Sequence, residues 1–203
     1  MLTVGFDLDM TLVDSRAGIR ACLEALADET DRTIDADAIV AQLGPPIRRA
    51  LADAFAEHEL DDAVRRFRVH MASFGAAMAT PMPGAGDAIA SVQSLGGRVL
   101  VVTAKHQPLA EVTMTATRLA TDALVGDLWG VDKALALREW SAQIYVGDHW
   151  ADVHAARAAD ATSVVVLTGG IDRRSLEDAS PDAILTDLGE FPDWLAQRYV
   201  RRR

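Results

Sequence analysis

The pattern of apolar residues along the chain alternates between short continuous runs and stretches with helical periodicity. The runs contain many β-branched residues and are LTVGF, RVLVVT, QIYVGD and SVVVLTG. The helical patterns lie at about residues 85–95, 106–120, 132–140 and 150–160. Runs that are apolar on both faces and alternate with helices are typical of a parallel sheet covered on both sides. The sequence therefore predicts an α/β fold with a Rossmann-like parallel sheet core and helices on both faces.

The segment from Ser15 to Thr80 has a different pattern, in which no strand is expected. Its apolar residues follow helical spacing in three stripes, which contain Ile19, Cys22, Leu23 and Leu26, then Ile47, Ala50, Leu51, Ala54 and Phe55, then Val64, Phe67, Met71, Phe74 and Met78. The stretch TPMPGAG at residues 80–86 suits a hinge back into the sheet domain. We therefore expect a core domain at residues 1–14 and 81–203 and an inserted helical cap domain at residues 15–80.

Polar residues stand where several of the predicted strands end. Asp7, Asp9, Thr103 and Asp148 each lie at or just past the end of a run, and ligands of parallel sheets bind at this carboxyl edge. Asp7 and Asp9, followed by Thr11, place a nucleophile and an acid/base partner close together. Two such carboxylates raise one another's pKa unless a cation lies between them. A bare Asp-x-Asp that only caps the next turn is the alternative.

A second acidic pair follows the run QIYVGD. If a helix begins near His149, Asp148 and Asp152 lie on one face of its first turn and face the same edge as Asp7. Acidic residues also favour helix N-termini without any metal, so both interpretations of this pair stay open.

Two further residues supply hydrogen-bond donors and positive charge. Thr103 ends the run RVLVVT, where its hydroxyl and the backbone N–H groups that follow can bind a phosphoryl oxygen. Lys133 begins the helix before the Asp148 run; an isolated lysine there would be a solvated helix residue. Together these motifs indicate a catalytic site, because they are unlikely to occur in this order by chance: Asp-x-Asp, a strand-end threonine, a lysine and Gly-Asp-x-x-x-Asp.

These motifs resemble those of the haloacid dehalogenase superfamily of phosphohydrolases. FDLDMTLVDS is similar to the family's first motif, and VVTAK, Lys133 and GDHWAD are similar to the second, third and fourth. The resemblance spans the whole chain. The helical module resembles the cap of the phosphoglycolate phosphatase-like and β-phosphoglucomutase-like branch, and residues 82–105 are similar to that branch's return into the core.

The resemblance implies a mechanism and a role for each residue. Asp7 attacks phosphorus and forms an aspartyl phosphate, while Asp9 protonates the leaving oxygen and then activates water. Mg²⁺ is held by Asp7, the backbone carbonyl of Asp9 and Asp148, with Asp152 direct or through water. The remaining phosphoryl oxygens are bound by Thr103, the backbone at Ala104, and Lys133. The expected activity is a Mg²⁺-dependent phosphatase for a small phosphorylated metabolite.

The cap loop LGPPIRRAL is similar to a loop that often faces the substrate in this branch. Arg48 is therefore the first choice for a specificity residue and Arg49 the second; an exposed helix-start charge is the alternative for either. Lys105 is a rival phosphate contact, because it follows Thr103 by two residues, and it also lies near enough to reach the cap.

The sequence departs from the family pattern in two places. Met10 stands where the first motif usually has glycine, so the turn after Asp9 is not expected to depend on a glycine-only backbone conformation. The frequent Gly-Lys-Pro around the lysine is missing at Lys133. The dehalogenases of the superfamily lack the second aspartate, so Asp9 argues against dehalogenation.

Two other functions remain as alternatives. A phosphomutase of the β-phosphoglucomutase kind uses the same residues and transfers the phosphoryl group to a sugar hydroxyl instead of water. A phosphoaccepting signalling receiver also has strand-end aspartates, a threonine and a lysine, but it needs neither a helical cap nor Asp9 as acid/base. The sequence leaves the substrate open.

Composition and charge limit the kinds of binding partner and cellular location that we expect. The formal net charge of −10 argues against a nucleic-acid binder, and Arg201, Arg202 and Arg203 are interpreted as a solvated terminus. Cys22 is the only cysteine, which excludes an internal disulfide. The apolar stretches are too short for a membrane helix, and we expect a cytoplasmic monomer or homodimer.

Aromatic residues cluster near the fourth motif. His149 follows Asp148 and is placed at the rim of the site, while His154 is interpreted as a helix-surface or packing residue. Trp129, Trp140 and Trp194 are interpreted as packing residues.

Overall fold

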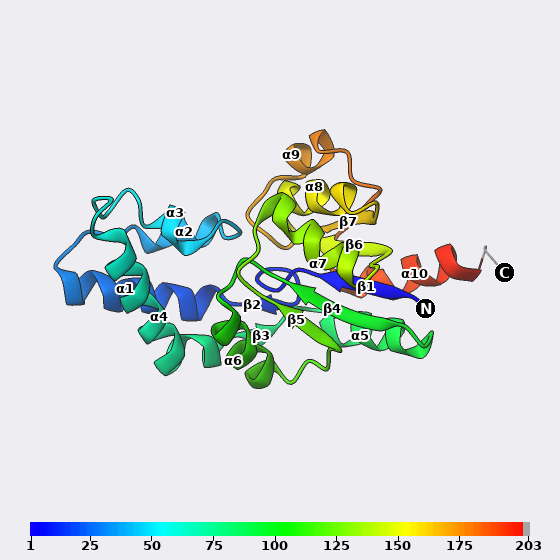
Figure 1. Cartoon of the computed structure of the whole chain (residues 1–203), viewed down its shortest axis with the longest axis horizontal. Helices are drawn as coiled ribbons and strands as arrows, with labels where there is room; N and C mark the ends of the chain where they lie inside the picture. Colours follow the sequence, from blue (N-terminus) through cyan, green and yellow to red (C-terminus); the bar gives the residue numbers. More distant parts are fainter. Residues whose placement is uncertain (201–203) are drawn as a thin grey trace.

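The computed structural model describes residues 1–200, without the side chains of Tyr199 and Val200 (Figure 1). The arginine tail, Arg201 to Arg203, lies outside the described residues. Within the described chain, no helix combines the length and apolar content that a membrane span requires.

A six-stranded parallel sheet forms the core domain, and its strand order is β5-β4-β1-β6-β7-β8. The strands are β1 (Thr3–Phe6), β4 (Arg98–Val102), β5 (Ala123–Val125), β6 (Ile144–Gly147), β7 (Thr162–Val166) and β8 (Ala183–Leu185). The four predicted runs are β1, β4, β6 and β7. The structure adds β5 and β8 at the two edges of the sheet.

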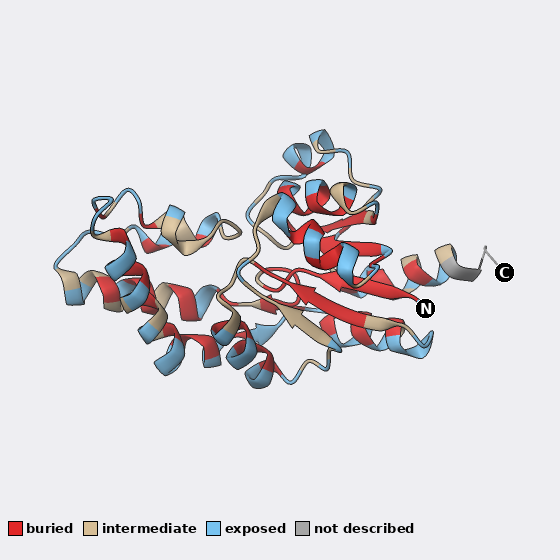
Figure 2. Ribbon diagram, viewed as in Figure 1, coloured by how far each residue is buried: buried red, intermediate tan, exposed pale blue. Residues whose placement is uncertain are grey.

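Helices cover both faces of this sheet, as the sequence predicts. On one face lie α5 (Ala85–Ser94), α6 (Gln107–Thr117), the short turn η4 (Leu188–Glu190) and α10 (Phe191–Val200). On the other lie α7 (Lys133–Glu139), preceded by η3 (Gly130–Asp132), α8 (Trp150–Ala158) and α9 (Arg173–Asp178). Figure 2 shows buried strands between helices whose outer sides are exposed. The α/β fold with a covered parallel sheet is confirmed.

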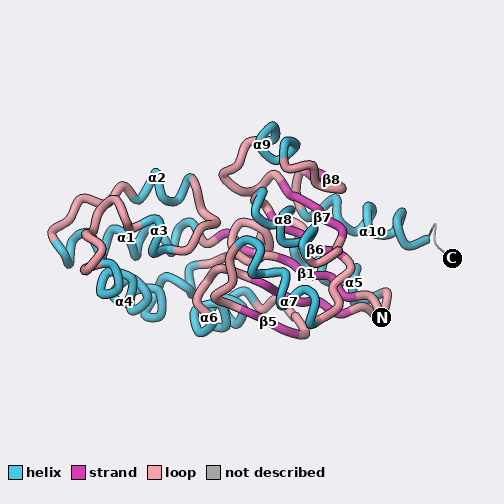
Figure 3. Tube along the Cα trace, turned by 45° about the horizontal axis from the view of Figure 1, so that its top comes forward, coloured by secondary structure: helices cyan, strands magenta, loops and turns pink. Residues whose placement is uncertain are grey.

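The inserted segment is helical and has its own apolar core. It contains α1 (Arg16–Thr30), α2 (Ala36–Ala41), α3 (Ile47–Ala50), α4 (Leu60–His70), a π-helical turn η1 (Met71–Gly75) and a 3₁₀ turn η2 (Ala76–Met78). Its buried cluster includes Leu23, Leu26, Leu51 and Phe67. Cys22 is also buried there, and burial raises the pKa of its thiol to about 11, as suits an inert packing residue. Figure 3 shows α1 to α4 gathered at one end of the molecule and the sheet at the other.

A short antiparallel pair joins the two parts. β2 (Val13–Asp14) precedes the cap, and β3 (Thr80–Pro81) follows it. The backbone leaves the core and returns to it side by side, so the pair forms a double connection between the cap and the sheet. The pair lies where the proposed domain boundaries fall, although no strand was expected at Thr80.

Candidate active site

The turn after β1 positions the first two aspartates. The Asp7 amide donates to the carbonyl of Val146 at 2.8 Å, and the Leu8 carbonyl accepts from the amides of Leu12 and Val13 at 2.9 and 3.0 Å. The chain therefore folds back directly after Asp7. Because the turn is tied to both β6 and β2, the two carboxylates are held at the carboxyl edge of the sheet.

Met10 adopts a conformation that differs from our expectation for this turn. Its φ is 64°, in the left-handed region that glycine favours, so the turn does use that conformation and the methionine adopts it. The Met10 amide donates to Val13 at 2.8 Å, and its carbonyl accepts from the Thr168 hydroxyl at 2.6 Å. Its side chain is buried in the core. These hydrogen bonds and contacts stabilise a residue that glycine would accommodate without strain.

Three charged side chains lie close to Asp7. Asp7, Asp148, Asp152 and Lys133 are all buried, and one oxygen of each carboxylate lies within 4.8 Å of the others. The Lys133 ammonium lies 2.7 Å from Asp152 Oδ1 and 3.0 Å from Asp7 Oδ1. The structure thus brings together the first aspartate, the lysine and the acidic pair of the predicted site.

Asp152 differs from Asp148 in how its oxygens are occupied. Asp152 Oδ1 accepts from Lys133, and Oδ2 accepts from the His149 amide at 3.1 Å, as part of a capping box at the start of α8. Asp148 Oδ1 accepts from the Thr11 hydroxyl at 2.8 Å, whereas Oδ2 is buried with no hydrogen-bond partner. Asp148 therefore has a buried oxygen without a hydrogen-bond partner, whereas both oxygens of Asp152 are engaged.

Three residues beside Asp148 and Asp152 had no role assigned from the sequence: Thr11, Gly147 and Gly169. The sequence showed Thr11 only as a hydroxyl near the aspartates. In the structure this hydroxyl donates to Asp148 and so orients its carboxylate. Gly169, after β7, lies so close to Asp148 that a side chain there would overlap the carboxylate. Gly147 is restricted in the same way by Asp152. For Gly169, the signal in the sequence is the pair of glycines at 169 and 170, directly after an apolar run.

The electrostatics of the cluster show an excess of negative charge. Burial, opposed by Lys133 and reinforced by Asp152, raises the pKa of Asp7 to about 7. Burial and the neighbouring Asp7 and Asp152 carboxylates also raise the pKa of Asp148 well above its usual range. Burial alone would lower the pKa of Lys133, but the two carboxylates outweigh it and raise that pKa. Three acidic groups around one ammonium suit an additional cation.

Thr103 and Lys105 lie on the other side of Asp7. Thr103 is buried just past the end of β4, and its hydroxyl oxygen accepts from the Lys105 amide at 3.1 Å. The Lys105 ammonium contacts both oxygens of Asp9, at 2.7 and 2.9 Å. Lys105 is therefore engaged with the second aspartate, and its role as a phosphate contact stays a proposal.

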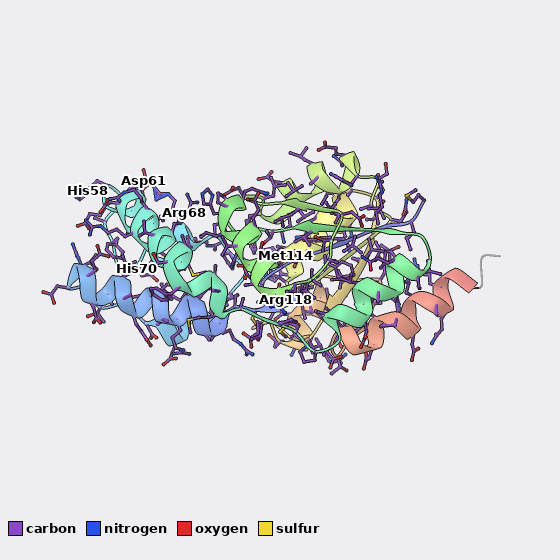
Figure 4. All side chains as sticks on the ribbon, turned by 90° about the horizontal axis from the view of Figure 1, so that it is seen from below. His58, Asp61, Arg68, His70, Met114 and Arg118 are labelled. Atoms are coloured by element: carbon purple, nitrogen blue, oxygen red, sulfur yellow. The ribbon has the colours of Figure 1, made fainter. Side chains whose placement is uncertain are left out.

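A large cavity lies between the cap and the core. Its volume is about 1180 Å³, and its lining includes Asp9, Ala104 and Lys105 from the core and much of the loop from 42 to 50 in the cap. On α4, Arg68 reaches toward the core (Figure 4), where its Nη2 lies 3.9 Å from Asp127 Oδ1. Both domains thus line this cavity, which reaches the predicted site at Asp9, Ala104 and Lys105.

The two neighbouring arginines of the cap loop have different surroundings, although both line the cavity. Arg48 Nη2 lies 2.7 Å from Glu57 and 3.5 Å from Asp61, while its Nη1 is buried without a hydrogen-bond partner. Arg49 is exposed and forms no ion pair within the described part of the chain. Its charge contributes to the lowered pKa of His149, for which burial is the main cause.

The aromatic residues near the fourth motif separate into two groups. Trp140 and Trp194 pack against apolar core clusters, and His154 is exposed, as predicted. Trp129 is half-buried and packs edge-on against His149, with ring centroids 5.1 Å apart, and it also lines the cavity. His149 is buried and caps α8 by accepting from the Ala151 amide at 3.0 Å.

Comparison with known proteins places this site in a family. The model of the haloacid dehalogenase-like hydrolases matches residues 4–157. The chain is 27% identical over 195 residues to the tyrosine-protein kinase PtkA of Mycobacterium tuberculosis, covering 89% of this chain and 67% of that protein. It is 26% identical over 206 residues to a phosphoglycolate phosphatase of Pseudomonas syringae, covering 90% and 75%.

Solved structures share the fold at lower identity. A haloacid dehalogenase-like hydrolase from Streptococcus pneumoniae superposes with a TM-score of 0.82 at 22% identity, over 98% of each chain. A predicted phosphatase from Clostridium acetobutylicum gives 0.85 at 23%, over 97% of this chain and 98% of that one. The family match includes the aspartates, the lysine and the inserted helices, and it confirms the resemblance found in the sequence. The chain belongs to the haloacid dehalogenase-like hydrolase family.

Proposed function

We propose that the protein is a Mg²⁺-dependent phosphatase that hydrolyses a small phosphomonoester through an aspartyl phosphate on Asp7. The observation that carries the proposal is the buried cluster of Asp7, Asp148 and Asp152 around Lys133. The family, and the phosphatases among similar proteins, support an enzyme of this hydrolase class. The phosphomonoester class rests on this chemistry, because a phosphoryl group needs both a nucleophile and fixed positive charge.

The acidic cluster fits a magnesium ion. Asp148 offers a buried carboxylate oxygen with no partner, and burial opposes the ionisation of both Asp7 and Asp148. Asp7, Asp148 and the backbone carbonyl of Asp9 would hold the ion, and Asp152, whose oxygens are already engaged, would act through water. When bound, Mg²⁺ would neutralise part of the charge on the phosphoryl oxygens.

The chain's own residues account for both chemical steps. A carboxylate oxygen of Asp7 forms a bond to phosphorus as the bond to the leaving oxygen breaks, and Asp9 gives that oxygen a proton. Asp9 then takes a proton from water, whose oxygen bonds to phosphorus and releases phosphate from Asp7. Lys133, Thr103 and the Ala104 amide bind the phosphoryl oxygens throughout.

The cavity favours an anionic substrate although the chain as a whole is acidic. Its charged lining residues are five basic ones, Arg48, Arg49, Arg65, Arg68 and Lys105, and three acidic ones, Asp9, Asp53 and Asp61. Four of the basic residues pair with carboxylates: Arg48 with Glu57 and Asp61, Arg65 with Asp62, Arg68 with Asp127, and Lys105 with Asp9. Among the described residues, Arg49 therefore supplies the unpaired positive charge of the lining that can attract an anion, in contrast to the net charge of −10 for the whole chain.

Phosphate release from p-nitrophenyl phosphate tests the proposed function. With Mg²⁺ we expect turnover, and excess chelator should lower the rate by roughly 10²-fold, since the acidic cluster then repels the phosphate. Re-addition of Mg²⁺ should restore the rate. An unchanged rate in excess chelator would remove the metal from the mechanism. Formation of a phosphosugar without phosphate release, in the presence of a sugar, would instead favour the phosphomutase.

The two cap arginines allow a matched comparison. Arg49→Ala should raise KM roughly tenfold for the alkyl phosphate ester that the wild-type protein hydrolyses best, because an unpaired guanidinium is free to bind a charged group of the substrate. Arg48→Ala should change KM less, because Glu57 and Asp61 already pair with its guanidinium. We therefore propose Arg49 before Arg48 as the specificity residue. Steady-state kinetics on both variants decide the order, and a larger effect at Arg48 would reverse it.

A further inference from the structure

We propose that Tyr145 is a positioning residue for the reaction: its ring holds the Lys133 ammonium in place, and its hydroxyl anchors that ring to the end of β4. The inference rests on the proposed phosphatase function, because it concerns the lysine that we propose as a phosphoryl contact. Tyr145 lies in β6, three residues before the proposed metal ligand Asp148. Its side chain is almost completely buried, so it acts through Lys133 and not on the ester.

Lys133 needs support from outside its own helix. It is the first residue of α7, a helix of seven residues, and the N-terminal end of a helix dipole favours negative rather than positive charge. The side chain is also fully buried, so bulk water does not solvate the ammonium. The position of the ammonium therefore depends on groups from the other elements that surround it.

Two carboxylates and two aromatic rings surround the ammonium. It lies 2.7 Å from Asp152 Oδ1 and 3.0 Å from Asp7 Oδ1. It also lies over the Tyr145 ring, 5.5 Å from the ring centroid, and 6.0 Å from the centroid of the Trp129 ring. At such distances a cation is attracted to the face of a ring, and more strongly where water is excluded. Because an ammonium has three N–H donors, the two carboxylates leave one donor for a phosphoryl oxygen.

A glycine in β1 allows the Tyr145 ring to reach this place. Gly5 and Tyr145 are paired across β1 and β6. A Cβ atom on Gly5 would lie 2.9 Å from Tyr145 Cδ2 and 2.8 Å from Leu137 Cδ2, so a side chain there would force one of the two to move. The phenol hydroxyl donates to the carbonyl of Val102 at 2.8 Å. Because β1 lies between β6 and β4, the Tyr145 side chain crosses β1 at the glycine and ends at β4.

The hydroxyl connects the ring to the second proposed phosphoryl contact. Val102 is the last residue of β4 and directly precedes Thr103. Tyr145 thus contacts the Lys133 ammonium with its ring and binds the strand end before Thr103 with its hydroxyl. If Lys133 and Thr103 moved relative to one another, their spacing around the phosphoryl oxygens would change, and a shift of about 1 Å can lower a rate roughly 10²-fold.

Tyr145 differs from an ordinary residue of the core. It belongs to a buried apolar cluster that includes Leu100 and Leu137, in which an apolar side chain would fill the space without a polar group. A buried hydroxyl lowers stability unless it is hydrogen-bonded, and this one is bonded to a strand end of the site. Trp140 packs against the same cluster but follows the last residue of α7, at the opposite end of the helix from Lys133.

Kinetics of Tyr145 variants test the role of the ring. Tyr145→Leu should lower kcat/KM roughly 10²-fold for p-nitrophenyl phosphate and for alkyl phosphates alike, because Lys133 would bind the phosphoryl group that all these esters share. Tyr145→Phe should lose less than about tenfold, since it keeps the ring and gives up one hydrogen bond. Equal losses in the two variants, or wild-type kcat/KM in Tyr145→Leu, would overturn the proposal.

Trp140→Leu is the matched control, because it removes an aromatic ring that packs on the same cluster outside the site. Melting temperatures of all variants should be measured, and kinetics compared well below the lowest of them. We expect Trp140→Leu to keep the wild-type kcat/KM; a loss as large as that of Tyr145→Leu would assign the effect of Tyr145 to packing. If Tyr145→Leu does not fold, Tyr145→Met replaces it, because a methionine side chain adapts to irregular gaps.

The ammonium itself can be observed without turnover. The chain has two lysines, Lys105 and Lys133, so nuclear magnetic resonance of protein labelled with ¹⁵N-lysine concerns two ammonium groups, which the Lys105→Met variant distinguishes. The Lys133 ammonium hydrogens should exchange slowly with water, since the group is buried between two carboxylates. Exchange should become roughly tenfold faster or more in Tyr145→Leu, and stay slow in Tyr145→Phe and Trp140→Leu.

This measurement separates the inference from the proposed function. If no ester is hydrolysed, the proposed phosphatase function fails, and the exchange rate at Lys133 still decides whether Tyr145 holds the ammonium. If esters are hydrolysed while exchange at Lys133 is equally slow in Tyr145→Leu and in the wild-type protein, the phosphatase function stands and the positioning role of Tyr145 is rejected.

Discussion

Asp7→Asn should abolish phosphate release from every ester, by roughly 10⁴-fold or more. No other carboxylate is expected to replace the nucleophile: both oxygens of Asp152 are engaged by Lys133 and the His149 amide, and Asp148, whose Oδ1 accepts from Thr11, is the proposed metal ligand through its free Oδ2. An asparagine side chain has nearly the same shape and removes only the charged oxygen. The measurement is phosphate release over hours, with mass spectrometry to exclude deamidation back to aspartate.

Asp132→Asn is the matched control for this substitution. Asp132 directly precedes Lys133 but is exposed, so its variant should keep full turnover. The Asp7→Asn protein should also remain folded, because burial already opposes the ionisation of Asp7. A folded Asp7→Asn variant with measurable multiple turnover would show that the nucleophile lies elsewhere.

The central strands were predictable because they are apolar on both faces. The runs that became β1, β4, β6 and β7 are buried along most of their lengths. β5 (Ala123–Val125) and β8 (Ala183–Leu185) were missed, since each has three residues, most of them only half-buried at a sheet edge. Three residues give too short a pattern to distinguish a strand from a loop.

The cap shows where helical periodicity is misleading. The apolar stripe from Ile47 to Phe55 predicts one continuous helix, but α3 ends at Ala50 and turns follow. Leu51 and Phe55 are nonetheless buried, so the stripe marks the buried side correctly. The spacing of apolar residues therefore predicts which side chains are buried better than it predicts a helix, because a series of turns can bury the same positions as a helix.

The sequence predicts those site residues that directly follow a strand. Asp7, Asp148 and Thr103 follow from the rule that parallel strands share one carboxyl edge. The partners within the site could not be predicted, because the Thr11 contact with Asp148 spans 137 positions and the Lys105 contact with Asp9 spans 96. Such pairs depend on the register of the sheet, and the spacing of motifs along the chain gives no information about that register.

The choice between Arg48 and Arg49 shows the same limit on a smaller scale. Neighbouring residues on a helix project about 100° apart, so only one of the two can face the core directly. The sequence contains no signal for which one, since Glu57 and Asp61, which engage Arg48, stand in the loop and helix that follow. The surroundings of each arginine thus depend on how the cap folds back on itself.

Asp9→Asn should slow turnover by roughly 10²–10⁴-fold without changing magnesium affinity much. The proposed metal contact of this residue is its backbone carbonyl, which the substitution preserves. The asparagine amide oxygen can still accept from the Lys105 ammonium, which lies 2.7 Å from Asp9 Oδ1. The variant therefore removes proton transfer while the side chain keeps its place, and steady-state kinetics with a magnesium titration measure both effects.

The size of the Asp9→Asn defect should depend on the leaving group. A phenolate departs without a proton, so p-nitrophenyl phosphate should suffer least, and an alkyl phosphate should suffer most because an alkoxide needs protonation. With the first step partly spared on the activated ester and water no longer activated, aspartyl phosphate should accumulate at Asp7. An acid quench followed by mass spectrometry of the peptide that contains Asp7 detects it.

Lys105→Met is the control that separates the carboxylate of Asp9 from its ion pair. It removes the ammonium and leaves Asp9 free to exchange protons, so the selective loss on alkyl phosphates should be absent or much smaller. If Asp9→Asn hydrolysed an alkyl phosphate at the wild-type rate, Asp9 would not act as the acid/base group. The pair of aspartates after β1 would then reduce to one nucleophile and one residue of the turn, fixed by its contact with Lys105.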